Sequence, residues 1–173
     1  MYKRDIPSLP KNFDQYIKLV PDLDLIDALH KYGNEYLEKE KNYLLALGDK
    51  VYAENKWTVK TILLHMIDAE RIFAYRALRF ARNDKTPLSG FDENEYAKAD
   101  VSNRTVTDLL IEFAAVRQAT LGLFLGFDDD ILLRQGTASG NEISVLALGF
   151  TIVGHELHHF NVLRERYYPL VSR

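Results

Sequence analysis

The sequence predicts an all-α fold, a four-helix bundle, on three observations. The chain of 173 residues has the size of one domain, so we expect a single domain over residues 1–173. It contains four stretches whose apolar residues recur every three or four positions, as on an amphipathic helix. Each stretch covers roughly 22–26 residues, which makes a rod of about 35 Å. Rods of similar length can bury one apolar stripe each only against one another, so a bundle is expected.

The first two helices are expected at residues 22–47 and 58–82. Asp22 is suited to be the N-cap of the first helix, and Gly48 its C-terminal stop. The first helix has an apolar stripe at steps of three, four or seven, formed by Leu25, Leu29, Tyr32, Tyr36, Tyr43 and Leu47. Residues 1–21 carry three prolines and are predicted to form an extended N-terminal arm.

The third and fourth helices are expected at residues 105–127 and 143–168. Thr105 and Asp108 have the spacing of a capping box, in which each side chain bonds the other's backbone N–H. The fourth helix begins at Ile143 or Ser144 and stops before Pro169, which cannot continue a helix.

The connection between the second and third helices, residues 83–104, is much longer than the other two connections. At roughly 3.3 Å per residue it can run the whole length of a helix. The third helix can then lie parallel to the second, in an up-down-down-up order. The alternative is a short helix within residues 92–99 inside an up-down bundle.

Composition excludes several classes of function. The chain has no cysteine, which removes thiolate catalysis by the protein, cysteine-bound zinc and iron–sulfur clusters. Its net charge of -3 provides no basic field for nucleic acid. No stretch reaches the roughly 18–20 apolar residues of a membrane span, and the N-terminus has no signal-peptide core. We therefore expect a cytoplasmic protein that binds neither nucleic acid nor membrane.

Three of the five histidines are predicted to face the bundle interior. At about 100° per residue, His155 and His159 fall within the apolar arc of the fourth helix, and His65 within that of the second. His158 falls beyond the edge of the arc, and His30 lies far from the stripe of the first helix.

Buried imidazoles are costly unless their nitrogens find partners. One divalent metal ion satisfies three histidines together, and three histidines with an open fourth position are typical of a catalytic site. The alternative is that each histidine bonds a backbone carbonyl or an acid. We predict one metal ion bound by His65, His155 and His159.

The segment from His155 to His159 also matches HExxH, the motif of zinc peptidases in which the glutamate is the general base. Such enzymes take a third ligand downstream, but no histidine follows His159 and Glu165 is the only acid there. A di-iron site would need a second Glu-x-x-His motif, which is missing. Both interpretations are disfavoured.

Three carboxylates are candidates for roles beside the metal. Glu156 is a candidate proton acceptor, although it can also turn to a neighbouring helix. Glu40 is expected level with His65, and Asp68 lies one turn beyond it, so either can orient that ring. The alternatives are surface ion pairs, with a lysine for Glu40 and with Arg71 for Asp68.

Two arginines also occupy core-facing positions. Arg76 and Arg117 each require a buried acid or a cavity, and either can hold a substrate carboxylate.

A tryptophan before a helix with one inward histidine, followed by HxxxH on the last helix, resembles the DinB/YfiT-like superfamily of metal-binding bundles. Here these residues are Trp57, His65, His155 and His159. The resemblance covers nearly the whole chain. It implies an up-down-down-up bundle, a homodimer, and one divalent metal, often nickel or zinc, on the three histidines. Relatives include bacillithiol S-transferases and a mycothiol-dependent maleylpyruvate isomerase.

The expected function is therefore a divalent-metal-dependent enzyme. A metal with an open position lowers the pKa of bound water or thiol and gives a nucleophile near neutral pH. The resemblance favours a thiol S-transferase that joins a low-molecular-weight thiol to small electrophiles in a stress response. The alternatives are a metal-dependent hydrolase and a non-enzymatic, metal-binding dimeric bundle.

Overall fold

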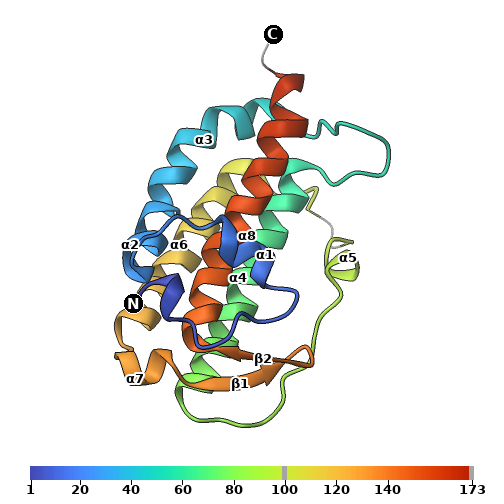
Figure 1. Ribbon diagram of the computed structural model, residues 1–173. Coiled ribbons are helices and arrows are strands. Elements are labelled where there is room, and N and C mark those ends of the chain that lie inside the picture. Colours follow the sequence, from blue (N-terminus) through green and yellow to red (C-terminus); the bar gives the residue numbers. More distant parts are fainter. Residues whose placement is uncertain (99–100, 172–173) are drawn as a thin grey trace.

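The protein is a four-helix bundle, as predicted (Figure 1). Within residues 1–98 and 101–171, which the computed structural model describes, four long helices pack side by side. They are α3 (Asn34–Leu47), α4 (Val59–Ala81), α6 (Val106–Leu125) and α8 (Val145–Val162). Thr58 and Thr105 cap α4 and α6, and Asp108 completes the predicted capping box.

The bundle has the up-down-down-up order because α4 and α6 run parallel. Arg71 pairs with Glu112 at 2.6 Å, and further along both helices Leu78 and Leu123 line one hollow. The crossover leaves α4 at one end of the bundle and returns along its side to the other end (Figure 1). It contains the short helix α5 (Glu93–Tyr96) with Asp92 as N-cap. A short helix thus exists, but it lies within the long crossover. Of the range 92–99 in which it was expected, residue 99 lies outside the described residues.

The predicted first helix is wrong as a single element. It is two helices, α2 (Leu25–Lys31) and α3, and Asp24 rather than Asp22 caps the first of them. At the break, Arg117 Nη1 donates to the carbonyls of Leu29, at 3.2 Å, and Tyr32, at 2.9 Å. A side chain on Gly33 would place its Cβ 2.8 Å from Arg117 Cγ. An arginine from α6 therefore satisfies the helix-end carbonyls and ends α2.

The N-terminal arm is not simply extended, which corrects another prediction. It forms the turn η1 (Lys3–Asp5) and the helix α1 (Asp14–Leu19), which packs across α8. The first two prolines precede α1 and Pro21 follows it, so none interrupts its hydrogen bonds. The backbone of α1 lies directly on α8, because a Cβ on Gly154 would be 2.0 Å from the Tyr16 carbonyl oxygen.

A small β-hairpin before α8 was not predicted. Strands β1 (Gln135–Ala138) and β2 (Asn141–Ser144) are antiparallel and joined by Ser139 and Gly140, both at positive φ. Two positive φ angles in a two-residue loop match the twist of a hairpin. The crossover docks on this hairpin, since the Leu88 N–H donates to the Thr137 carbonyl and the Ser139 N–H to the Leu88 carbonyl. The short helix α7 (Asp129–Leu132) precedes the hairpin.

The ends of α6 and α8 differ slightly from the prediction. Helix α6 stops at Leu125, and α8 is α-helical only to Val162. The winding then continues as a π-turn, η2 (Leu163–Tyr167), and a 3-10 turn, η3 (Tyr168–Leu170), which contains Pro169. Ser144 caps α8 as its side chain accepts from the Ala147 N–H at 3.1 Å. No described helix is both long and apolar enough to cross a membrane.

Candidate metal centre

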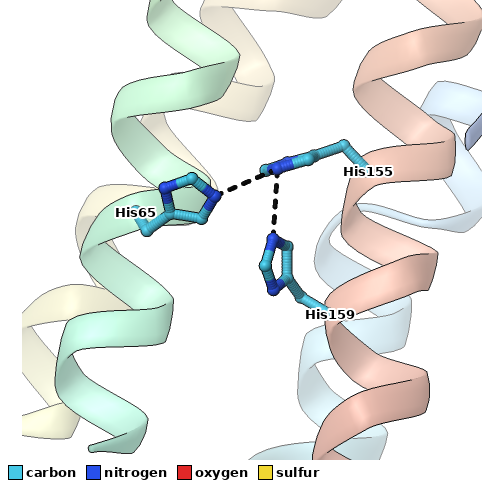
Figure 2. A group of neighbouring side chains, drawn as sticks. All are labelled: His65, His155 and His159. Atoms are coloured by element: carbon cyan, nitrogen blue, oxygen red, sulfur yellow. Dashed lines mark hydrogen bonds between the residues drawn. The ribbon is translucent and has the colours of Figure 1, made fainter. Parts of the chain in front are cut away.

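The structure brings together the three histidines that the sequence predicts to face inward. His65 comes from α4, and His155 and His159 come from neighbouring turns of α8 (Figure 2). The Nε2 atom of His155 lies 3.1 Å from Nε2 of His65 and 3.1 Å from Nε2 of His159. One potential ligand atom from each of the three residues lies within 4.8 Å of the others.

This arrangement fits a divalent metal ion. A tetrahedral ion with nitrogen ligands at about 2.0–2.1 Å separates its donors by about 3.3–3.4 Å. The two Nε2–Nε2 distances of 3.1 Å are close to that spacing. Imidazole nitrogens suit zinc, copper, iron and nickel alike. The three residues are therefore able to hold one ion and leave a coordination position open.

The protonation state of the histidines suits the same role. Burial, together with the smaller effect of neighbouring histidines, lowers the pKa of His65 to about 4 and that of His159 to about 3. Burial also holds the pKa of His155 well below its ordinary value. The rings are therefore neutral at physiological pH, as metal ligation requires.

Aromatic rings hold the histidines in place. The Trp57 ring lies 5.1 Å from the His65 ring, and Tyr16 and Phe73 meet His155 edge-on at 5.2 and 5.8 Å between centroids. Tyr16 belongs to α1, so sequence analysis missed it as a site residue. Its contribution depends on how the arm folds over α8, which no local pattern encodes.

Two cavities adjoin the centre. One, of about 290 Å³, reaches His65 and His155, and the other, of about 340 Å³, reaches His159. Trp57 and His158 also line the second cavity. The ligands are thus accessible to small molecules through these cavities.

The other two histidines lie apart from the three, as expected. His30 is exposed on α2. His158 is half-buried beside Tyr16, with 5.4 Å between ring centroids, and does not belong to the set of converging ligand atoms.

Glu156 points to a neighbouring helix, one of the two directions considered from the sequence. Its Oε2 accepts from Arg117 Nη2 at 2.8 Å, while both oxygens of Glu70 accept from the same guanidinium at 2.8 Å. All three side chains are buried. Glu156 is therefore held in an interior ion cluster formed by Arg117, Glu70 and Glu156.

Burial raises the pKa of Glu156 to about 8, although Arg117 acts in the opposite direction. One guanidinium compensates one carboxylate, and Arg117 already binds both oxygens of Glu70. Glu156 Oε1 is buried and has no hydrogen-bond partner among the described residues. The raised pKa predicts that Glu156 holds a proton near neutral pH.

Glu40 and Asp68 make their contacts away from the histidine rings. Glu40 is buried, pairs with Arg164, and accepts from the Tyr168 hydroxyl at 2.5 Å. Asp68 faces Arg71 at 3.7 Å, the surface pair considered from the sequence. No contact among the described residues supports the predicted role of either carboxylate in orienting His65, so both roles stay predictions.

A family model described as the DinB superfamily matches residues 24–163. The chain belongs to the DinB superfamily. The matched residues include all three histidines of the centre, so the resemblance drawn from Trp57 and the HxxxH motif is confirmed.

A solved structure supports the fold of this DinB-superfamily chain. It is similar to YfiT from Bacillus subtilis, described as a probable metal-dependent hydrolase with an unusual four-helix bundle topology. The identity is 17%, the TM-score is 0.67, and the match covers 94% of this chain and 90% of that one. At this identity the similarity establishes the fold. No curated protein matches the chain.

Proposed function

We propose that this chain is a divalent-metal-dependent enzyme with His65, His155 and His159 as its metal ligands. The observation that carries the proposal is the convergence of their imidazole nitrogens beside two cavities. A zinc or nickel ion bound there would lower the pKa of a thiol or water at its open position. The rings hold the ion, and the cavities admit small molecules.

We further propose that the activated group is a low-molecular-weight thiol, transferred to a small electrophile. Hydrolysis by bound water is helped by a general base close to that water. Among the described residues that line the two cavities, Glu93 is the only carboxylate, and it is exposed. A thiol has a pKa near 8.5 in water, against about 15.7 for water itself, so the metal has a smaller pKa shift to supply for a thiol. This difference favours thiol transfer, and a role in stress response agrees with it.

A metal-dependent hydrolase is the second candidate. It is favoured by the similarity in fold to YfiT, whose description names that activity. The two candidates share the same ligands and differ in the nucleophile, so substrates can separate them.

The test loads the purified chain with zinc or nickel and measures two reactions. One is conjugation of a small thiol to chlorodinitrobenzene, and the other is hydrolysis of nitrophenyl acetate. We expect metal-dependent conjugation, reduced at least about 100-fold in His159→Ala, with His30→Ala as the exposed-histidine control. Metal-dependent hydrolysis without conjugation would favour the second candidate. Turnover that survives chelation and also survives His159→Ala would contradict the two candidate functions. A metal-loaded protein without turnover would favour the non-enzymatic bundle.

We also propose a homodimer. Ile111 and Leu125 lie exposed on α6, at 66% and 63% of their full accessible area, and two such surfaces can cover each other. Light scattering after size exclusion should give twice the chain mass of 20.0 kDa. A mass of one chain at micromolar concentration would contradict the proposal.

A further inference from the structure

Arg76 is a buried guanidinium with no carboxylate partner. Its side chain on α4 is 2% exposed, and its Nη2 donates to the Ser89 carbonyl at 2.9 Å and to Ser139 Oγ at 3.0 Å. In the described part of the chain no acid lies within ion-pair distance of it. By contrast, Arg117, the other arginine of the core, binds two glutamates.

A buried guanidinium is costly to desolvate unless an anion compensates it. Both protein acceptors of Arg76 are neutral and share one nitrogen, Nη2. Its Nε and Nη1 make no hydrogen bond to any described residue. Nε and Nη1 therefore keep N–H groups that can each donate a charge-assisted hydrogen bond to an anion.

Arg76 lines the same cavity of about 290 Å³ as His65 and His155. It follows His65 by eleven positions, which is three helical turns, so both residues lie on one face of α4. The backbone separation is about 16 Å, and helical side chains lean towards the N-terminus, here towards His65. The guanidinium and the metal centre therefore contribute to two ends of one cavity.

Arg76 is the only lysine or arginine among the described residues that line this cavity. The one acid there, Glu93, is exposed on α5 and forms no ion pair with Arg76. The remaining lining residues are neutral or aromatic. The interior of the cavity thus presents one uncompensated positive charge.

We propose that Arg76 binds a carboxylate of the small molecule that reacts at the histidine centre. This rests on the proposed function and narrows its substrate to compounds with a carboxylate at one end and the reacting group at the other. The crossover and the β-hairpin supply Ser89 and Ser139, which hold Nη2 and leave the N–H groups of Nε and Nη1 to donate to the ligand.

The competing explanation is that Arg76 only ties the crossover to the hairpin. The two explanations differ in what Arg76 does to ligands. A structural tie affects acids and neutral analogues alike, whereas a carboxylate-binding residue discriminates between them.

The test uses straight-chain mercapto acids of increasing length and their matched carboxamides as probes. Calorimetry on the cobalt-loaded protein gives the affinities, and the thiolate-to-cobalt absorption band reports contact with the metal. At the chain length that spans the cavity, the acid should bind about 10- to 100-fold more tightly than the amide. Arg76→Gln should remove this preference and leave the affinity for the amide and the cobalt content unchanged.

Two further variants control for charge and for folding. Arg82→Gln removes an exposed positive charge from the end of the same helix and should keep the full preference. Arg76→Lys keeps the charge but not the fixed, planar set of N–H donors, and it should keep part of the preference. If Arg76→Gln does not fold, the wild-type preference and its reduction in Arg76→Lys decide the question.

The outcomes separate this inference from the proposed function. Equal binding of acid and amide by the wild type, or no binding of either, overturns the role of Arg76. A preference for the acid over the amide that survives in Arg76→Gln also overturns that role. An acid preference without a thiolate-to-cobalt band supports Arg76 and contradicts thiol activation.

Discussion

His155 occupies the middle of the candidate centre, with its Nε2 facing both His65 and His159 (Figure 2). Side chains four residues apart on a helix are neighbours, so His155 and His159 are paired by α8 alone. His65 joins them only because α4 packs antiparallel to α8. At the scale of single residues, the site therefore combines one local pair with one ligand that comes from a distant part of the sequence.

The neutral histidines make the stability of the metal-free protein depend on pH. The pKa of His65 is lowered from 6.5 to about 4, so between these values the unfolded chain binds a proton that the folded chain does not. Stability is then complete above pH 6.5 and falls as the pH drops towards 4. Denaturation with urea at several pH values should show that His65→Gln reduces this slope by up to about 1.4 kcal/mol per pH unit.

His30→Gln is the control for this pH dependence, because it removes an exposed imidazole and should leave the slope unchanged. An identical slope in wild type and His65→Gln would contradict the lowered pKa.

Glu156 and Glu70 should respond differently to amide substitution. If Glu156 carries a proton, Glu156→Gln replaces one neutral group by another and should cost at most about 1 kcal/mol at pH 7. Glu70→Gln removes the charged partner of Arg117 and should cost about 3 kcal/mol or more. Chemical denaturation of both variants measures the difference.

Turnover of Glu156→Gln tests the role of Glu156 as a proton acceptor at the metal. If Arg117 holds Glu156 away from the metal, Glu156→Gln should keep turnover within a few-fold of wild type. A general base typically contributes about 100- to 10,000-fold, so a loss of that size would instead assign the role to Glu156.

At the scale of elements, α1 covers α8 beside the histidine centre. The contact is close because Gly154 has no side chain: a Cβ there would lie 2.4 Å from the Tyr16 carbonyl carbon. Tyr16 in turn contacts the rings of His155 and His158. The position of α1 therefore determines one wall of the site.

Gly154→Ala should displace α1 and destabilise the fold by about 1–3 kcal/mol, since backbone cannot yield as a flexible side chain does. The matched control is Gly122→Ala in α6, where a Cβ meets nothing within 4 Å and should stabilise by about 0.5–1 kcal/mol. Thermal unfolding measures both changes. A harmless Gly154→Ala would contradict the direct contact between α1 and α8.

At the scale of the whole molecule, the histidine centre joins α4 to α8, two antiparallel helices of the bundle. A metal ion that binds the folded chain and not the unfolded chain stabilises the fold by mass action. The same ion also gives the nitrogen lone pairs of three neutral imidazoles a common partner.

Adding zinc or nickel to the metal-free protein should therefore raise its melting temperature. At a free ion concentration of about 100 times the dissociation constant, the gain is about 2.7 kcal/mol. Calorimetry should show that a chelator reverses the shift and that His65→Ala abolishes it, whereas His158→Ala keeps it. An equal shift in His65→Ala and the wild type would place the ion elsewhere.

The sequence by itself determined the features that depend on neighbouring residues. The period of apolar residues placed α4, α6 and α8, and the span that α2 and α3 share. Thr105 with Asp108 marked the start of α6, and Ile143 or Ser144 that of α8. The same period selected His65, His155 and His159, because whether a side chain faces the core depends on its angle around its own helix.

The tertiary structure alone decided what depends on contacts between distant residues. Arg117 ends α2 from 88 residues away, at the Leu29 carbonyl, so no local pattern could reveal that break. The same guanidinium holds Glu156 in the interior ion cluster. Arg76 lies in a cavity rather than beside an acid because the crossover and hairpin meet there. Helical periodicity indicates that a side chain faces inward, but only the packed chain determines what it meets.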